Sequence, residues 1–329
     1  MRVVFSESGS DFVSREWNDL VEADPSGSFF QTPEYLKLYW EEFGEEQDLL
    51  MAFVEQGIAQ VAACAFERSG QQLRFLGGTE VTDYLGPVAV EPPREMAGEI
   101  VSALVRFGGW TNADFRNLVE DSPWLEALTA AVAAEGLWYQ VEEQDVCPFL
   151  PLPQTWEEYL GSLPGKLRHE IKRKARRLEA EGGPFRLVFS DGSTIEEDLE
   201  RFFALHRSSE GPKGKFMEPG MEIFFRRLAQ SFLPFDTFRL AFIEVNGVKV
   251  AGAIAFLDRP RKRLLLYNSA FDHEWKPLSP GMVLVAEMIR TSIEEGLEGF
   301  DLLKGGLEYK YRFGSHPRKL MRLRATLGG

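Results

Sequence analysis

Two stretches of this chain repeat each other at a distance of about one domain. Residues 52–66 read AFVEQGIAQVAACAF, and residues 241–256 read AFIEVNGVKVAGAIAF, with one extra residue at the turn. In each copy two apolar runs flank a glycine turn, and Asn246-Gly247 is a strong two-residue hairpin signal. The two copies lie about 190 residues apart, far more than the period of a solenoid. The repeat therefore predicts a duplicated domain.

The segments around the two hairpins also correspond. Helical sequence precedes each hairpin, and Thr32-Pro33 has the form of an N-cap followed by proline at the first helical position. After each hairpin we expect a strand (72–76 and 263–267), then a helix (96–107 and 281–295), then a short strand (114–119 and 299–303). A hairpin that gains a parallel strand through a helix predicts a mixed α/β fold. The Pro-rich stretch 148–153 predicts the boundary between domains 1–153 and 154–329.

The bulk composition limits the classes of protein that the chain can belong to. Its 329 residues suit two domains, and 44% hydrophobic with 27% charged residues is typical of a globular protein. No apolar run approaches the ~20 residues that span a bilayer, and the N-terminus lacks the apolar region of a signal peptide. Cys64 and Cys147 lie in apolar stretches and the four histidines are scattered. We therefore expect buried thiols, no metal site and a cytoplasmic protein.

The charge is unevenly distributed. The net charge of −14 argues against a general nucleic-acid-binding protein, and DNA is not an expected partner. Residues 166–177 nevertheless hold seven Lys/Arg against one acid, and residues 304–324 hold seven more against one acid. An acidic chain that concentrates positive charge in two short segments of its C-terminal half favours a local anionic ligand over a long polyanion.

The order of hairpin, strand, helix and strand resembles the core of GNAT acyltransferases. The duplicated core, with a basic helix before its second copy, resembles the FemAB-type and cellulose-biosynthesis-type (CelD-like) acetyltransferases. The strings that carry the resemblance are TDYLGP at 82–87, RHEIKR at 168–173 and GFDLLKGGLEYK at 299–310. The resemblance implies two tandem GNAT-like domains, each a mixed central sheet flanked by helices. It also implies that the C-terminal domain binds acetyl-CoA or another acyl-CoA as co-substrate, while the first shapes the acceptor cleft without binding a donor.

The donor is expected at the start of the helix 281–295. Ser279-Pro280-Gly281 opens this helix, and the N–H groups and dipole of a helix N-terminus attract anions. GNAT pyrophosphate loops usually read Arg/Gln-x-x-Gly-x-Gly/Ala, whereas residues 275–282 read WKPLSPGM with one glycine. Ordinary helix capping by Ser279 is the alternative interpretation. The expected donor-binding residues are Tyr267, Ser279, Gly281, Met282 and Lys310.

The segment 304–310 is expected to carry the chemistry. Glu308 could accept the proton of an attacking amine, directly or through water, and Tyr309 could donate to the leaving thiolate. Lys310 could hold a phosphate or carboxylate. The alternative is a solvated loop with Tyr309 packed beneath it. Direct transfer is expected, because no Cys or Ser sits beside an obvious base.

His206 is a third catalytic candidate. It follows an apolar helical stretch and precedes a glycine-rich segment, residues 208–220, that is expected to be a mobile loop. A histidine there could bind substrate or act as a base near neutral pH. A single histidine on a helix is also a common structural residue, so both interpretations stay open.

Acceptor-binding residues are expected from both halves of the chain. Arg168, Lys172 and Arg176 share one face of a basic helix, where like charges four residues apart repel each other. An anionic partner would relieve that repulsion, although a solvated basic face is the alternative. The expected substrate-binding residues are Asp83, Tyr84, Arg168, Lys172, Asp301, Lys304 and Gly305.

These patterns favour an acyltransferase, in particular an N-acetyltransferase. The expected acceptor is an amine or hydroxyl of a sugar, nucleotide-sugar, amino acid or cell-envelope precursor, as in polysaccharide biosynthesis. Such an acceptor would place the protein at the periphery of the envelope biosynthesis machinery. One alternative is a FemAB-type aminoacyltransferase that uses aminoacyl-tRNA in peptidoglycan bridge formation, with the basic segments on tRNA phosphates. The acidic total and the lack of a long helical arm count against it. The other alternative is a non-catalytic module that binds an anionic ligand.

Overall fold

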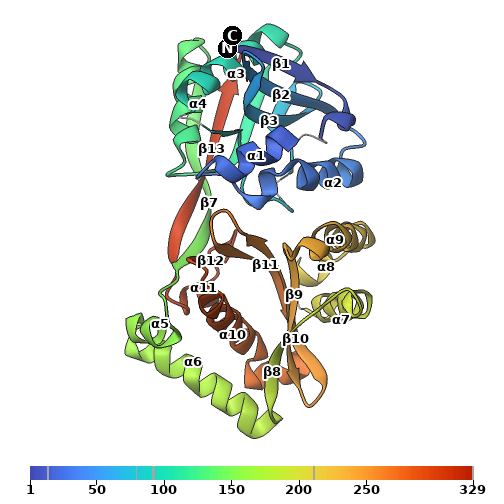
Figure 1. Ribbon diagram of the computed structural model, residues 1–329, viewed down its shortest axis with the longest axis vertical. Coiled ribbons are helices and arrows are strands. Elements are labelled where there is room, and N and C mark those ends of the chain that lie inside the picture. The colour runs from blue at the N-terminus through green and yellow to red at the C-terminus, as the bar shows by residue number, and fades with distance from the viewer. Residues whose placement is uncertain (13–14, 79, 91–92, 210–211, 328–329) are drawn as a thin grey trace. The chain divides into compact units, whose positions relative to one another are not determined.

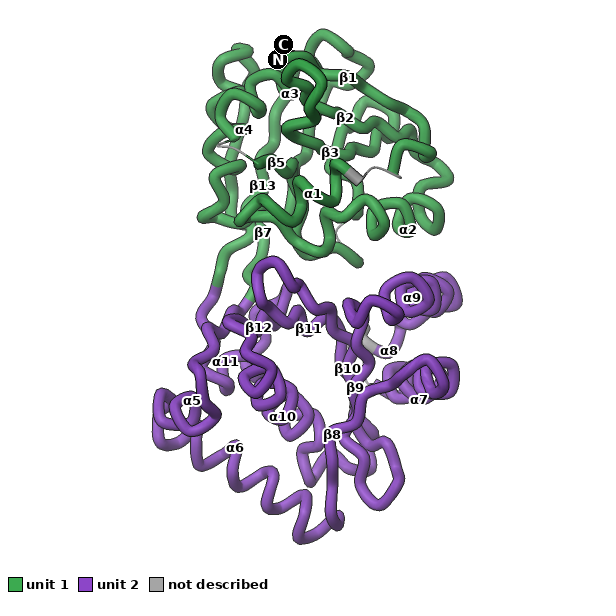
Figure 2. The backbone as a smooth tube through the Cα atoms, viewed as in Figure 1, with its two compact units in different colours: residues 1–147, 318–329 green, residues 148–317 purple. Residues whose placement is uncertain are grey.

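The computed structural model describes all residues except 13–14, 79, 91–92, 210–211 and 328–329. The chain forms two compact units, shown in green and purple in Figure 2. Unit 1 consists of Met1–Cys147 and Arg318–Gly329, and unit 2 consists of Pro148–Pro317. The chain therefore passes into unit 2 along one strand, β7 (Trp138–Pro151), and returns to unit 1 along another, β13 (His316–Thr326).

Unit 1 is a mixed sheet with helices on both faces (Figure 1). Its strands follow the order β1-β2-β3-β4-β6-β13-β7, with β5 beside β3. The remaining strands are β1 (Arg2–Ser6), β2 (Asp48–Gln56), β3 (Ala59–Ser69), β4 (Gln72–Phe75), β5 (Val88–Ala89) and β6 (Asn112–Val119). The helices are η1 (Gly9–Phe12), α1 (Arg15–Ala23), η2 (Phe29–Gln31), α2 (Pro33–Phe43), α3 (Arg94–Phe107) and α4 (Pro123–Ala134). The central residues of β2 and β3 are buried without alternation, as in a sheet covered on both faces.

Unit 2 repeats this plan. Its strands follow the order β8-β9-β10-β11-β12-β7. The strands are β8 (Phe185–Phe189), β9 (Phe238–Val245), β10 (Val248–Asp258), β11 (Arg263–Phe271) and β12 (Gly299–Asp301). The helices are α5 (Trp156–Ser162), α6 (Gly165–Arg177), η3 (Leu178–Gly182), α7 (Ile195–Arg207), α8 (Pro212–Phe216), α9 (Pro219–Phe232), η4 (Leu233–Phe235), η5 (His273–Leu278), α10 (Pro280–Glu294) and α11 (Glu308–Tyr311). Helix α10 packs on one face of this sheet together with α6, and α7 and α9 cover the other face (Figure 1).

The predicted mixed α/β fold is confirmed, and so are both hairpins. Asn246 and Gly247 have φ of 49° and 81°, the left-handed conformations that a tight type I′ turn requires at both positions. Thr32 caps α2 by accepting a hydrogen bond from the Tyr35 N–H, with Pro33 in the first turn. Helix α8 lies within the segment expected to be a loop, and Gly211 of that segment lies outside the described residues.

The second basic segment, residues 304–324, is divided between the two units, which corrects the interpretation that both segments belong to the C-terminal domain. Arg318, Lys319, Arg322 and Arg324 belong to the part of β13 that lies in unit 1. Carboxylates of unit 1 pair with three of these cations: Lys319 with Glu143, and Arg322 and Arg324 both with Glu142. The expected boundary lies close to the point where the chain enters unit 2, but no sequence feature indicated that the last residues return to unit 1.

In each unit, two parallel strands pair briefly and then separate. In unit 1, Gln72–Arg74 of β4 pair with Asn112–Asp114 of β6. In unit 2, Arg263–Leu265 of β11 pair with Gly299–Asp301 of β12. The carboxyl ends of such strands leave a crevice in which α/β proteins commonly bind ligands. The fold thus provides one crevice in each unit.

Candidate functional site in unit 2

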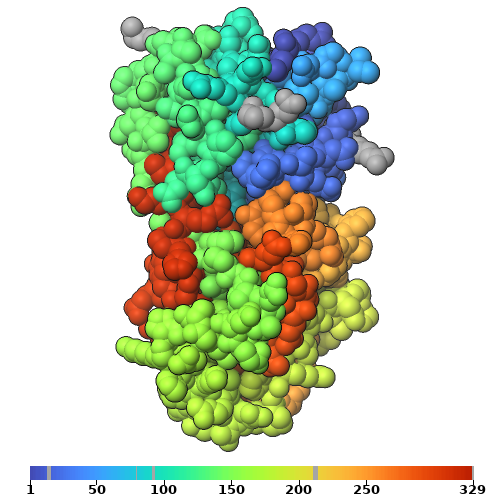
Figure 3. Space-filling model, turned by 60° about the vertical axis from the view of Figure 1, so that its left-hand side comes forward, coloured from blue at the N-terminus to red at the C-terminus, as the bar shows by residue number. Residues whose placement is uncertain are grey.

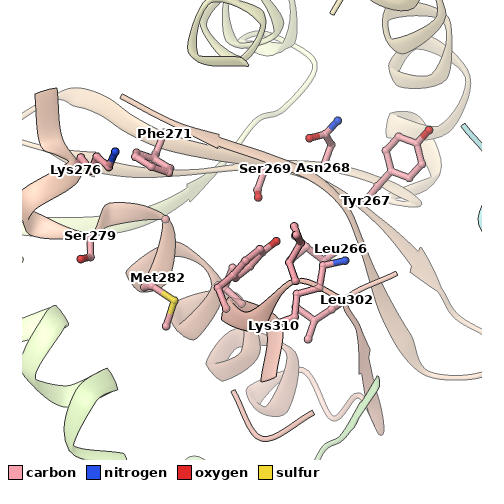
Figure 4. A pocket seen from close by; sticks show the side chains of 14 residues that line it. Leu266, Tyr267, Asn268, Ser269, Phe271, Lys276, Ser279, Met282, Leu302 and Lys310 are labelled. Atoms are coloured by element: carbon pink, nitrogen blue, oxygen red, sulfur yellow. The ribbon is translucent and has the colours of Figure 1, made fainter. Parts of the chain in front are cut away.

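The crevice of unit 2 opens into a pocket of about 400 Å³ (Figure 4). The lining is predominantly apolar, with a few polar side chains, which is typical of small-molecule sites. The lining residues are Leu266, Tyr267, Asn268, Ser269, Phe271, Lys276, Ser279, Gly281, Met282, Val285, Leu302, Leu307, Tyr309 and Lys310. They come from β11, from η5, from the first turns of α10 and from the segment after β12. The pocket therefore lies where the two parallel strands have separated.

A β-bulge shapes the strand side of this pocket. Ala255 of β10 pairs with Leu266, whereas its neighbour Ile254 pairs with Asn268, so Tyr267 is the extra residue on β11. A bulge leaves the extra residue out of the regular ladder and re-aims the side chains around it. Tyr267 and Asn268 accordingly lie on the same side of β11, while Leu266 and Ser269 point to the opposite side (Figure 4).

The bulge divides the pocket residues between two environments. On the α7 and α9 side, His206 Nε2 lies 3.1 Å from Asn268 Oδ1, and the Tyr267 ring packs edge-to-face on Phe225 with centroids 5.7 Å apart. His206 is buried behind Asn268 and does not itself line the pocket. The prediction that His206 belongs to the site is therefore met only indirectly. His206 contacts Asn268, and Asn268 lines the pocket.

On the α10 side, Tyr309 brings a phenol into the pocket. Burial raises its pKa above the usual range for tyrosine, and a side-chain hydrogen bond with Ser269 acts in the opposite direction. The phenol is therefore protonated at neutral pH and can donate a proton or a hydrogen bond.

The start of α10 combines a helix N-terminus with two lysines. Ser279 has φ of 56° and ψ of 46°, and its hydroxyl accepts a hydrogen bond from Lys174 Nζ of α6 at 3.1 Å. Pro280 has no N–H, and the N–H groups of Met282 and Val283 bond the Ser279 carbonyl. An anion at this end would therefore depend on Lys174 and Lys276 in addition to the helix dipole.

Close packing explains the glycine near this helix end. A Cβ at Gly281 would lie 3.2 Å from Phe271 Cδ1, so a side chain there would press on the pocket wall.

Figure 3 shows the light-green residues of α6 at the surface beside the orange-red residues around the start of α10, where Lys174 meets Ser279. Any anion that approaches the helix end from this side therefore meets the basic helix.

The segment after β12 is held together by Lys310. This lysine is 6% exposed, and its Nζ donates hydrogen bonds to the carbonyls of Leu303 at 3.0 Å and Lys304 at 2.7 Å. Asp301 is fully buried and accepts a hydrogen bond from the Leu303 N–H. Gly305 has φ of 102°, which permits the reversal of the chain around the lysine. Lys310 therefore contacts the pocket while it also organises the loop that closes it.

Glu308 lies outside the pocket. Its side chain is 86% exposed and forms an ion pair of 2.9 Å with Arg312, which also reaches Glu170 of α6. Arg168 and Lys172 line a separate, shallower groove between α5 and α6, with Trp156 and Leu160. The structure thus does not bring these three expected site residues to the pocket.

Asp83 and Tyr84 belong to unit 1. Both are buried, and the Arg318 guanidinium lies 5.6 Å from the centroid of the Tyr84 ring. Their neighbour Thr82 is held by hydrogen bonds to Gly77 and Asn117, so this segment is a firmly packed part of unit 1.

Several pocket residues were absent from the sequence-based set. The missed residues are Leu266, Asn268, Ser269, Phe271, Lys276, Val285, Leu302 and Leu307. Some of them had a signal: the polar pair Asn268-Ser269 follows an apolar strand and marks the place where its pattern changes. The bulge that gives the pair its function has no such signal in a single sequence.

Neither a metal site nor a membrane span is found in the part of the chain that the structure describes. No group of three or more His, Cys, Asp or Glu side chains there could hold a metal ion. None of the described helices has the length and hydropathy needed to cross a membrane.

The comparisons with known proteins agree with this geometry. Residues 165–311 match the model of the acetyltransferase (GNAT) domain family. Unit 2 contains a GNAT domain. The matched residues run from α6 through α11 and so include the whole pocket lining. No protein of curated function is significantly similar to the chain.

Solved structures extend the fold match to both units. FemX aligns with a TM-score of 0.65 at 9% identity, over 98% of this chain and 97% of that one. The structure titled L-PGS from Bacillus licheniformis aligns with a TM-score of 0.63 at 14% identity, over 96% and 93%. A tandem GNAT protein from the clavulanic acid biosynthesis pathway aligns with a TM-score of 0.53 at 12% identity, over 100% of both chains. At these identities the matches show a shared fold, that of tandem GNAT domains.

Proposed function

We propose that unit 2 is an N-acyltransferase that uses an acyl-CoA thioester as donor and transfers the acyl group directly to an amine. The observation that supports this most is the bulge at Tyr267, placed where β11 and β12 separate and where the pocket lies. A bulged strand can turn a backbone N–H toward the pocket, and such a donor would stabilise the oxyanion that forms when an amine attacks the thioester carbonyl.

The residues on the α10 side suit a CoA-type donor. Phe271, Met282 and Val285 offer apolar walls for the pantetheine arm. Lys276, with Lys174 of α6, offers cations for the pyrophosphate beside the start of α10. Because Pro280 replaces a backbone donor, we infer that this chain holds the pyrophosphate more by its lysines than by the glycine-rich loop usual in GNAT domains.

Tyr309 is the proposed acid. Its phenol is protonated at neutral pH and lies in the pocket, so it can give a proton to the departing thiolate of CoA. The acceptor amine would approach from the α7 and α9 side, where Asn268 can orient it. The proton that the amine loses would pass to water, and Tyr309 would be reprotonated from solvent.

Donor binding provides the first test. The full chain should be stabilised by acetyl-CoA or a longer acyl-CoA, by about 2.7 kcal/mol at a concentration 100 times the dissociation constant. Replacing Gly281 by valine should abolish this shift, because the added side chain presses on Phe271. No stabilisation by any acyl-CoA would overturn the proposal.

A second candidate donor is an aminoacyl group carried by tRNA. It is favoured by the exposed basic face of α6, which includes Lys172, Arg173 and Arg176 and adjoins the start of α10. Binding of tRNA should then weaken steeply with salt, and charge reversal at Lys172 and Arg173 should reduce the slope of that dependence. Tight acyl-CoA binding without measurable tRNA binding would exclude this candidate.

A further inference from the structure

The crevice of unit 1 occupies the same topological position as the pocket of unit 2 but has the opposite chemistry. It forms a cavity of about 110 Å³ lined by Glu67, Arg74, Phe75, Gly78, Leu85, Asp114 and Arg116. Asp114 is the last residue of β6 that pairs with β4, as Asp301 is the last residue of β12 that pairs with β11. Where unit 2 has an apolar pocket, unit 1 therefore has a small cavity with four charged side chains.

Asp114 and Arg116, the two charged residues of β6 that line the cavity, are paired with other side chains of the protein. The Arg116 Nε donates to Asp114 at 2.8 Å, and Arg322 of β13 donates to both Asp114 oxygens at 2.5 and 2.9 Å. These contacts hold the pKa of Asp114 below its usual range against the opposing effect of its burial. Asp114 and Arg116 therefore form a fixed charged wall rather than a pair that awaits a ligand.

Glu67 and Arg74 are arranged differently. They are direct partners across the antiparallel β3–β4 ladder, a position where opposite charges normally meet. Arg74 is nevertheless exposed and forms no ion pair within 4.0 Å among the described residues, while Glu67 is only 3% exposed. The hydrogen bond described for Glu67 comes from the Tyr39 hydroxyl of α2 at 3.3 Å. The cavity thus separates a buried carboxyl from a guanidinium at the surface.

We propose that this cavity binds a small α-amino acid, with the ligand ammonium on Glu67 and the ligand carboxylate on Arg74. A simple anion would lie against the Glu67 carboxyl, and a simple cation would lie against Arg74, so a ligand with both charges matches the cavity better than either. In an α-amino acid one carbon separates the two charged groups, which suits two side chains on facing strands. The volume equals about three to four waters at roughly 30 Å³ each, which favours glycine or alanine over larger side chains.

The groups that face Glu67 also predict how this binding depends on pH. They are Tyr39 from α2, Arg74 from β4, and Asp114 with Arg116 from β6. Burial raises the pKa of Glu67 to about 7, while Tyr39 and Arg74 act in the opposite direction. A ligand ammonium requires the ionised carboxylate. Below pH 7 binding must therefore release a proton, and affinity should fall about tenfold per pH unit.

Titration calorimetry of the full chain tests the proposal. L-alanine and glycine should bind at millimolar concentration, and propionate and ethylamine, which each carry one of the two charges, should bind at least tenfold more weakly. Arg74→Gln should remove binding, and because Arg74 is exposed this variant should fold normally. Glu67→Gln should remove binding at every pH, because the neutral amide cannot pair with the ligand ammonium. The matched control is Arg106→Gln, an exposed cation on α3 of the same unit that should leave binding unchanged.

Absence of amino-acid binding at pH 8 would overturn the proposal, and so would equal binding to the wild-type chain and the Arg74→Gln variant. Propionate binding as tightly as alanine would also contradict it, because the cavity would then be an anion site. Acyl-CoA binding in unit 2 should be the same in the Arg74→Gln and Glu67→Gln variants as in the wild-type chain. The amino-acid proposal for unit 1 and the acyl-CoA proposal for unit 2 are therefore tested independently.

Discussion

The ring of His206 reaches the pocket through one side chain: its Nε2 lies 3.1 Å from Oδ1 of Asn268. His206 itself packs against the rings of Phe202 and Phe216, with centroids 6.0 and 5.8 Å away. When Nε2 carries the proton, it donates to the Asn268 oxygen and so fixes the orientation of the amide. The amide NH₂ can then donate a hydrogen bond to a ligand in the pocket. His206 is therefore best described as a positioning residue for Asn268.

Substitution of this pair should be non-additive. Asn268→Ala should lower kcat/KM about tenfold to hundredfold, because the acceptor loses an orienting amide, and His206→Phe should lower it by a similar factor. The double variant should lose no more than either single variant, since both changes remove the same interaction. Steady-state kinetics of all four proteins checks this, and multiplicative losses would contradict a shared role.

Tyr309→Phe should lower kcat by about 10²-fold or more with little change in KM, because proton donation contributes to the transition state and not to ground-state binding. The wild-type rate should not fall with pH until the raised pKa of Tyr309 is approached, above the usual range for tyrosine. The matched control is Glu308→Gln, the residue directly before Tyr309. Because Glu308 is exposed and paired with Arg312, this change should leave kcat near the wild-type value. A large loss in Glu308→Gln would return the role of base to this carboxylate.

Replacing Lys276 and Lys174 by glutamine should weaken acetyl-CoA binding roughly tenfold or more, because both cations lie at the start of α10. Binding of acetyl-pantetheine, which lacks the pyrophosphate, should be unchanged in the same variant. Calorimetry with the two thioesters separates these effects. An equal loss for both ligands would indicate that the lysines support the fold of the pocket rather than hold phosphate.

The buried Glu67 predicts an unusual dependence of unit 1 stability on pH. Its pKa is raised from 4.5 to about 7, so the native state binds more protons than the unfolded state between these values. The free energy of unfolding should therefore fall as pH rises from 4.5 to 7, by up to about 3 kcal/mol from this group, and then level off. Glu67→Gln should flatten this slope. Denaturant unfolding of both proteins across this pH range checks the prediction.

Much of the fold could be predicted because its signals are local. The hairpin at Asn246-Gly247 follows from turn chemistry, and the start of α2 follows from Thr32 and Pro33. The start of α10 likewise follows from Ser279-Pro280-Gly281, and Ser279 and Gly281 line the pocket. Each of these features is determined by a few adjacent residues, which is why one sequence suffices to find them.

The parts that could not be predicted depend on contacts between distant segments. The bulge at Tyr267 is a mismatch between β10 and β11, so neither strand shows it alone. Glu308 is exposed and Lys310 is buried, although the two residues are only two positions apart on one short helix. Whether a charged side chain in a loop faces solvent or a pocket is decided by packing, and residue type says little about it.

The path of the chain through β7 and β13 has a consequence for how the protein can be taken apart. Topologically, unit 2 is a guest inserted into a host, because unit 1 is completed only by β13, beside β6 and β7 in its sheet. A stop codon after unit 1's first segment would leave the host without that strand. Excising the guest and joining Cys147 to Arg318 by a short linker would instead keep every host strand. Melting the guest alone would lengthen the loop that the host must close, an entropic cost that grows slowly with loop length, so the stability of the host is linked to the folding of the guest.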